Sequence, residues 1–241
     1  MAILEAIEVT KCFGGLIANN KISLSVKEGD IVGLIGPNGS GKSTFFSCIS
    51  GFHKVSSGKV IFGGSDITGL SPHRICKLGI ARTFQITEVF TKMTVLENVT
   101  VGAFKMSKDL ASAKSLGIET LKLVGLVQKM DESSKGLSPP ERRRLSFAMA
   151  LATSPKLLML DESMAGLLPV EISELLKLIR KINGEGITII IIEHVMEAVM
   201  SIAETIVVLE AGKVIASGTP KDIAGNERVI EAYLGENYRY A

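Results

Sequence analysis

The fold of this chain is constrained most by one nine-residue stretch, Gly36-Pro37-Asn38-Gly39-Ser40-Gly41-Lys42-Ser43-Thr44. It matches the phosphate-binding loop pattern Gly-x4-Gly-Lys-Ser/Thr, which is specific when it lies between a buried strand and a helix. Residues 31–35 are apolar and predict a short buried strand, and the apolar spacing after residue 44 predicts a helix. We therefore interpret the stretch as a polyphosphate site rather than as a Gly-rich turn with a solvated lysine.

The chemistry of the loop follows from its residue types. Gly39 and Gly41 let successive backbone N–H groups curl around phosphate oxygens, and the start of a helix adds partial positive charge there. Lys42 is expected to place its charge on the β and γ phosphates of a nucleotide. The hydroxyl of Ser43 is expected to bind Mg²⁺, and Thr44 to donate a further hydrogen bond to phosphate. The loop thus predicts a polyphosphate and Mg²⁺ as ligands.

Strands and helices alternate along the chain, which favours an α/β fold with a largely parallel sheet. The most β-branched run, residues 187–192, predicts a central buried strand, and residues 207–216 predict a hairpin. Between about residues 88 and 152 the apolar spacing is helical, as expected for an inserted lobe. We expect one domain, 1–241, with a core formed by 1–87 and 153–241 and a helical subdomain at 88–152.

Four residues outside the loop are candidates for the same site. Asp161 and Glu162 end the apolar strand at 157–160, where an aspartate can bind Mg²⁺ and a glutamate can activate water. His194 follows the strand at 187–192, a place where α/β proteins put ligand-binding residues, although a helix cap is an equal alternative. Gln85 follows the strand at 80–84 and is a further candidate for Mg²⁺ or water. Each alone could be an ordinary surface residue.

Charge and cysteine content exclude some other classes of protein. The net charge of +2 over 241 residues argues against a dedicated nucleic-acid binder. The cysteines, Cys12, Cys48 and Cys76, match no metal spacing and suit a reducing compartment. No signal peptide, membrane span or lipid anchor is apparent in the sequence, so we expect a soluble or peripheral protein of the cytoplasm.

Further segments extend the match to a family over essentially the whole chain. The chain resembles the ATP-binding cassette (ABC) ATPases of membrane transporters, and within them the ATPase subunits of branched-chain amino-acid importers. The segments that carry the resemblance are the loop at 36–44, the glutamine Gln85 after Gly79–Phe84, Met93–Val99, the signature-like 137–145, Asp161-Glu162, Ala165–Leu167, Ile192-Glu193-His194 and Val229–Gly235.

The resemblance implies a phosphate-loop NTPase core with a mixed sheet, an antiparallel β subdomain and an inserted helical subdomain. It implies that Phe13 stacks on the adenine, that Glu162 is the catalytic base and that His194 contacts the γ-phosphate. Ser43, Gln85 and Asp161 would be the metal-binding residues. Membrane permease subunits are the implied partners, docking near residues 86–104, and the ATPase would work as a homodimer or as a heterodimer with a related subunit.

The chain departs from the family in the segment that closes over the ATP of a facing subunit. The family signature is Leu-Ser-Gly-Gly-Gln, and here Ser138 is followed by Pro139, Pro140 and Glu141. Two prolines remove two backbone donors, and the glutamate brings a carboxylate toward a polyanion. Ser138 and the start of the helix remain. Ser163 and Leu168 also differ from the usual proline and aspartate, a variation known among importer ATPases.

The leading hypothesis is an ATP-hydrolysing subunit of an importer for branched-chain or similar amino acids. One alternative is the ATPase of a lipopolysaccharide or other exporter, because residues 231–240 also resemble that group. Another is a nucleotide-gated module with little hydrolysis, suggested by the altered signature. A third is a small-molecule kinase with a phosphate loop.

Overall fold

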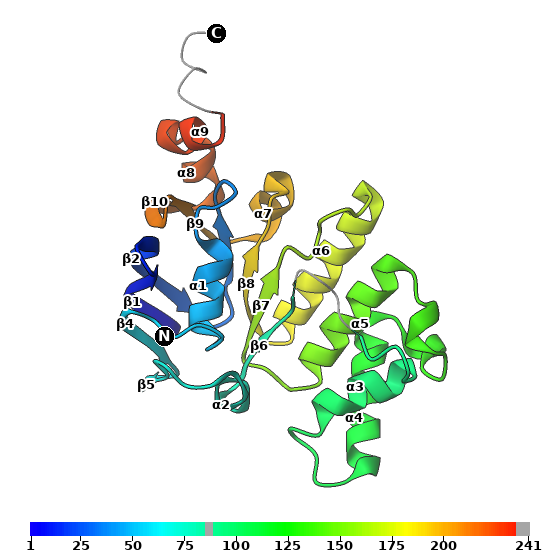
Figure 1. The fold of residues 1–241 in the computed structure, drawn as a ribbon. Coiled ribbons are helices and arrows are strands. Elements are labelled where there is room, and N and C mark those ends of the chain that lie inside the picture. The colour runs from blue at the N-terminus through cyan, green and yellow to red at the C-terminus, as the bar shows by residue number, and fades with distance from the viewer. Residues whose placement is uncertain (85–88, 235–241) are drawn as a thin grey trace.

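The computed structural model describes residues 1–84 and 89–234, which form two sheets and a set of helices packed beside them (Figure 1). The strands are β1 (Ala2–Phe13), β2 (Leu16–Lys27), β3 (Ile31–Ile35), β4 (Ser57–Phe62), β5 (Ser65–Asp66), β6 (Ile80–Arg82), β7 (Leu157–Asp161), β8 (Thr188–Ile192), β9 (Thr205–Glu210) and β10 (Lys213–Gly218). The helices are α1 (Lys42–Ile49), α2 (Pro72–Leu78), α3 (Val95–Ala103), α4 (Leu110–Val124), α5 (Pro139–Leu151), α6 (Pro169–Gly184), α7 (Met196–Ile202), α8 (Pro220–Ala224) and α9 (Glu227–Leu234). Two single-turn 3-10 helices, Val127–Lys129 and Ser134–Gly136, precede α5.

The larger sheet has the strand order β10-β9-β3-β8-β7-β6, and the smaller one has the order β2-β1-β4-β5. In the larger sheet β9, β3, β8, β7 and β6 pair in parallel, and β10 pairs antiparallel with β9. The pairs of the smaller sheet are antiparallel. The predicted class is confirmed: an α/β core with a mixed sheet beside an antiparallel sheet.

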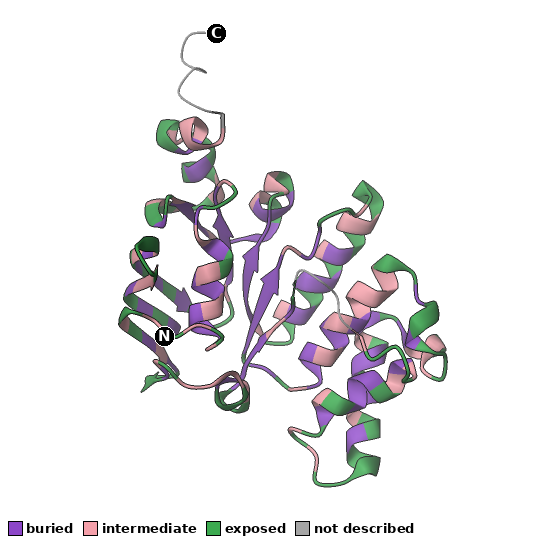
Figure 2. Cartoon of the chain, viewed as in Figure 1, coloured by how far each residue is buried: buried purple, intermediate pink, exposed green. Residues whose placement is uncertain are grey.

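The central strands are buried on both faces, as Figure 2 shows. Because alternate side chains of a strand point to opposite faces, β8 contributes to two separate parts of the core. Ile189 and Ile191 pack in the cluster that includes α5 and α6, while Ile190 and Ile192 pack with α1. This explains why the strand reads as a continuous apolar run in the sequence.

Helix α1 lies between the two sheets (Figure 1). Phe45, Phe46 and Ile49 are fully buried and share one hydrophobic cluster with Leu4 and Ile22 of the antiparallel sheet. That packing fixes the helix against both sheets, so the phosphate-binding loop before it has a rigid support.

Helices α3, α4 and α5 gather at the far side of β6 and β7, away from the antiparallel sheet (Figure 1). Their buried side chains belong to the same hydrophobic cluster as Leu158 and Leu160 of β7. Apolar packing is therefore continuous from this helical group into the sheet, and the predicted subdomain boundaries at 88 and 152 stay a prediction. Within residues 1–84 and 89–234, none of the helices combines the length and apolar character needed to cross a membrane.

Candidate nucleotide-binding and catalytic site

The phosphate-binding loop joins β3 to α1, as the sequence predicts. Gly36 and Gly41 have φ angles of +147° and +99°. A Cβ atom on Gly36 would lie 2.0 Å from the carbonyl oxygen of Leu209, and one on Gly41 would lie 2.5 Å from that of Ala18. Both the backbone conformation and the close approach of other strands therefore require glycine at these two positions.

The ammonium group of Lys42 lies inside this loop. Its Nζ donates hydrogen bonds to the carbonyl oxygens of Gly36, at 2.8 Å, and Pro37, at 3.0 Å. Burial lowers the pKa of Lys42, and the negative charges of Glu162 and Asp161 act in the opposite direction. The loop thus presents a positive charge near two acids. An entering phosphate would replace the loop carbonyls as the hydrogen-bond partner of Lys42.

A pocket of about 470 Å³ opens over the loop. It is lined by Phe13, Leu16, Ile17, Ala18, residues 38–44, Glu162, Ala211 and Gly212. The ring of Phe13 is 43% exposed, packs edge-to-face on His53 and has the ammonium of Lys11 4.7 Å from its centroid. The structure therefore brings the predicted adenine-stacking residue and the predicted base to the same pocket as the loop.

Asp161 and Glu162 follow each other at the carboxyl end of β7. The carboxylate of Asp161 accepts a hydrogen bond from Arg82 Nη2 at 2.6 Å, and both side chains are largely buried. Asp161 and the exposed hydroxyl of Ser43 are oxygen donors of the kind that Mg²⁺ prefers. The donor set of this site therefore fits a magnesium ion that also binds nucleotide phosphates.

Glu162 contacts His194 directly. His194 Nε2 lies 2.6 Å from Glu162 Oε1, and the backbone N–H of Glu162 donates to the carbonyl oxygen of Ile192 at 2.9 Å. The helix α7 has Val195, not His194, at its N-cap position, so the alternative reading of His194 as a helix cap is wrong. A glutamate oriented in this way by an imidazole can accept a proton from an attacking water molecule.

The signature-like segment forms the start of α5. Ser138 is the N-cap residue, and Pro139 and Pro140 occupy the first two helical positions, where a missing N–H costs little. The backbone N–H and the hydroxyl of Ser138 both donate to Glu141 Oε2 at 2.9 Å, and Lys129 Nζ lies 2.8 Å from Glu141 Oε1. The bond from Lys129 and those from Ser138 lower the pKa of Glu141 to about 2. This carboxylate is therefore ionised and already bonded within its own chain.

Gln85 lies outside the described residues. Three further charged residues near the acids escaped the sequence analysis: Arg82, Arg143 and Glu193. Arg82 and Glu193 could have been found from the sequence. Arg82 ends the apolar strand Ile80–Arg82 and Glu193 directly follows Ile192, and a charged residue beside a buried strand is unusual unless it is paired.

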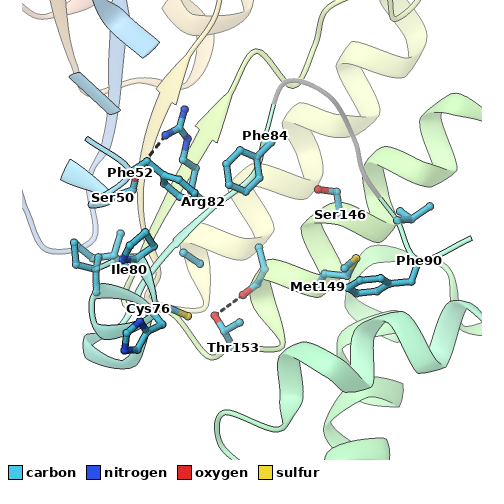
Figure 3. Close-up of a pocket in the computed structure, with 16 residues that line it drawn as sticks. Ser50, Phe52, Cys76, Ile80, Arg82, Phe84, Phe90, Ser146, Met149 and Thr153 are labelled. Atoms are coloured by element: carbon cyan, nitrogen blue, oxygen red, sulfur yellow. Dashed lines mark hydrogen bonds between the residues drawn. The ribbon is translucent and has the colours of Figure 1, made fainter. Parts of the chain in front are cut away.

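A second pocket, of about 560 Å³, lies between the core and α5. Figure 3 shows Phe52, Arg82 and Phe84 on the side of the core, with Ser146 and Met149 of α5 facing them. Phe90 lies beyond Met149. The groove has aromatic walls and adjoins the segment that the resemblance assigns to permease docking.

Comparison with known families decides the assignment. Residues 19–165 match the family described as ABC transporter, and residues 213–239 match the one described as branched-chain amino acid ATP-binding cassette transporter. The chain belongs to the ABC transporter family. It is an ATP-binding, ATP-hydrolysing subunit, which excludes the small-molecule kinase.

Relatives of this ABC subunit with closely matching length are known. The high-affinity branched-chain amino acid transport ATP-binding protein BraF of Pseudomonas aeruginosa is 40% identical, with 97% of this chain and 98% of BraF covered. LivG of Escherichia coli, named for the same transport, is 38% identical, with 93% and 94% covered. The lipopolysaccharide export system ATP-binding protein LptB of Haemophilus influenzae is 33% identical, with 99% and 100% covered.

Solved structures of ABC ATPases share the fold. The ADP conformation of MJ1267, an ATP-binding cassette of an ABC transporter, has a TM-score of 0.87 and 32% identity, with 98% of this chain and 100% of that chain covered. A dimeric, post-hydrolysis ATP-binding cassette, MJ0796, bound to ADP and Pi, has a TM-score of 0.80 and 26% identity, with 90% and 98% covered. By sequence, this ABC subunit is most like the branched-chain amino-acid importer ATPases.

Proposed function

We propose that this ABC subunit drives the import of branched-chain or related amino acids by binding and hydrolysing Mg-ATP. Support for the substrate class comes from the two most similar sequences quoted, whose names give this transport, and from the match of residues 213–239. The observation that carries the hydrolytic role is the contact between His194 and Glu162, 2.6 Å apart, at a pocket that also contains Lys42.

The residues of the pocket divide the work of hydrolysis. Lys42, with the backbone N–H groups of residues 38–44, binds and neutralises the phosphates. Phe13 offers a half-exposed ring for the adenine. Glu162 accepts the proton of the attacking water, and His194 orients Glu162 and reaches toward the γ-phosphate. Gln85 completes the set as a further ligand of metal or water.

A magnesium ion would be held by Ser43 and Asp161, with Gln85 as the third side chain. When bound, such an ion neutralises charge on the phosphates during their transfer. The role of this chain's own residues is to present oxygen donors at the end of β7 and the start of α1. The ion pair of Asp161 with Arg82 keeps that carboxylate in place before the nucleotide arrives.

The partners are a second ATPase subunit and membrane permease subunits. The second subunit, identical or related, would close over the nucleotide bound to this chain. In return, Ser138, Pro139, Pro140 and Glu141 of this chain would close over the nucleotide bound to the second subunit. The aromatic groove of Figure 3 would receive a permease segment. The chain would then act at the cytoplasmic face of the membrane without insertion, as one domain whose core is 1–87 and 153–241 and whose helical subdomain is 88–152.

The substrate class is tested by uptake. Cells that lack this chain should lose uptake of radiolabelled leucine, regain it with the wild-type chain and fail to regain it with Glu162→Gln. The exposed Glu119, which pairs with Lys122, provides the matched control Glu119→Gln, which should restore uptake fully. Unchanged leucine uptake together with a defect in lipopolysaccharide export would instead support the exporter function suggested by the similarity to LptB.

A further inference from the structure

Glu193 is a buried acid outside the proposed catalytic set. It directly follows β8 and is 1% exposed. A carboxylate removed from water is costly unless hydrogen bonds compensate it. Its Oε1 accepts a bond from the backbone N–H of Met164 at 2.7 Å and another from the hydroxyl of Ser163 at 3.1 Å. The two donors are the two residues that follow Glu162.

The turn held by Glu193 has an unusual backbone. Glu162 has a φ of +47°, in the left-handed region that non-glycine residues rarely adopt. Such a conformation persists only where the surrounding structure enforces it. Hydrogen bonds hold the chain on both sides of this conformation. The N–H of Glu162 itself donates to the carbonyl of Ile192, and the N–H of Met164, two residues later, donates to Glu193.

A second charged residue reaches the same turn from the helical group. Arg143 of α5 donates from Nη2 to the carbonyl oxygen of Ala165 at 2.9 Å. Its Nη1 is buried and has no hydrogen-bond partner among the described residues. Burial lowers the pKa of Arg143, and the charge of Glu193 is the largest influence opposing that. Arg143 and Glu193 therefore both bond to residues after Glu162, one from the signature helix α5 and one from the end of β8.

We propose that Glu193 is a positioning residue for Glu162 and that Arg143 connects the signature helix α5 to the same turn. The proposal rests on the role of Glu162 as the base. In this arrangement a shift of α5 moves Ala165, and with it the turn whose geometry aims the carboxylate of Glu162. The orientation of the helix that faces a partner's nucleotide and the alignment of this chain's own base are thus set together.

Two substitutions at residue 193 separate the hydrogen bonds from the charge. Glu193→Gln retains an acceptor oxygen in nearly the same shape, and Glu193→Leu retains the approximate size but removes the acceptor. Small displacements of a catalytic group can cost about a hundredfold in rate. We expect Glu193→Leu to lower kcat at least about tenfold, with ATP affinity within about threefold of wild type, and Glu193→Gln to keep most of the rate.

The purified full-length chain is assayed with radiolabelled ATP, so that slow hydrolysis is sufficient, and ATP binding is measured by calorimetry. The decisive comparison adds each change to Glu162→Gln. If Glu193 acts through Glu162, Glu193→Leu should lower the rate in the wild-type background but not in the Glu162→Gln background. Equal losses in both backgrounds, or no loss in wild type, would overturn the proposal.

Arg143→Met is the independent variant, because it leaves β8 intact even if Glu193→Leu fails to fold. Arg143→Met should lower kcat without weakening ATP binding. As for Glu193→Leu, the loss should occur in the wild-type background and not in the Glu162→Gln background. An unchanged rate would remove Arg143 from the proposal. If Glu162→Gln alone hydrolyses ATP normally, the base itself is misassigned. If Glu162→Gln is inactive but the Arg143 and Glu193 variants are not, only the positioning role fails.

Discussion

The guanidinium of Arg82 lies 2.6 Å from the carboxylate of Asp161, and the two side chains are 9% and 5% exposed. Arg82 also donates from Nη1 to the hydroxyls of Ser47 and Ser50, each at 3.1 Å. Through this one side chain the ends of β6 and β7 are tied to α1. Arg82 also lines the groove of Figure 3, so one side chain contacts both the proposed docking surface and the proposed metal ligand Asp161.

Removing Arg82 should be strongly destabilising. Breaking a buried ion pair by deleting one partner leaves an uncompensated charge and costs about 3–5 kcal/mol. We expect Arg82→Met to lower the free energy of unfolding by about this amount in denaturant titrations. Lys122→Met is the matched control, since its pair with Glu119 is exposed and should contribute little. Similar small losses for both variants would show that the Arg82 pair adds no stability.

Lys42→Ala should abolish tight binding of Mg-ATP. A charge-assisted hydrogen bond contributes about 1.5–3 kcal/mol, so the affinity should fall about tenfold or more. Calorimetry of the purified chain measures the effect, with the exposed Lys59→Ala as control. If ATP affinity is unchanged in Lys42→Ala, the phosphate-binding role of the loop is wrong.

Glu162→Gln should leave ATP binding intact and slow hydrolysis about a hundredfold or more, as expected for loss of a general base. ATP should then keep two subunits associated, which gel filtration with ATP and Mg²⁺ would detect as a larger species. Near-normal hydrolysis by this variant would move the base elsewhere, and His194, 2.6 Å from Glu162, would be the next candidate.

Local sequence patterns predicted those site residues that can be recognised within a single segment of the chain. The loop at 36–44 has a specific spacing, and Asp161 and His194 each follow an apolar strand, so their place at one edge of a parallel sheet could be derived. The contacts between segments could not. Arg82 meets Asp161, and Arg143 meets Ala165, only because of the order of β8, β7 and β6 and the packing of α5.

Glu193 should make stability depend on pH. Burial raises the pKa of Glu193 from 4.5 to about 7. Between these values the folded chain binds more protons than the unfolded chain, so this contribution to stability is present below about pH 4.5 and is lost as the pH rises through about 7. The full difference is on the order of 3 kcal/mol.

The measurement compares the unfolding free energy of wild type and Glu193→Gln from pH 4.5 to 8. Other groups contribute to the pH dependence of both proteins, and Glu162, His194 and Arg143 interact with Glu193, so only the difference between the two proteins is informative. That difference should grow in favour of Glu193→Gln as the pH rises. A constant difference would mean that Glu193 does not titrate in this range.

The two sides of the proposed dimer are not equally well equipped in this chain. Lys42 and Glu162 line the pocket proposed for its own nucleotide, and Ser43 and Asp161 are the proposed oxygen donors for a metal. The segment offered to a partner's nucleotide instead has Pro139 and Pro140 without N–H groups, and the Ser138 hydroxyl donates to Glu141 of the same chain. A heterodimer with a related ATPase that has an intact signature would complete this chain's own site, whereas a homodimer would use the altered segment twice.

We therefore predict that the chain alone hydrolyses ATP slowly and that the triple change Pro139→Gly, Pro140→Gly, Glu141→Gln accelerates it. Losing a donor aimed at transition-state charge costs about 2.7–4 kcal/mol, so the gain on reversion could reach a hundredfold or more. A matched control is Pro220→Gly with Asp222→Asn in α8, another helix that begins with proline and whose N-cap residue donates to an acid in the first turn. The control should leave the rate unchanged. Brisk hydrolysis by the unmodified chain, insensitive to the triple change, would show that Ser138 and the start of α5 suffice and that the subunit can work as a homodimer.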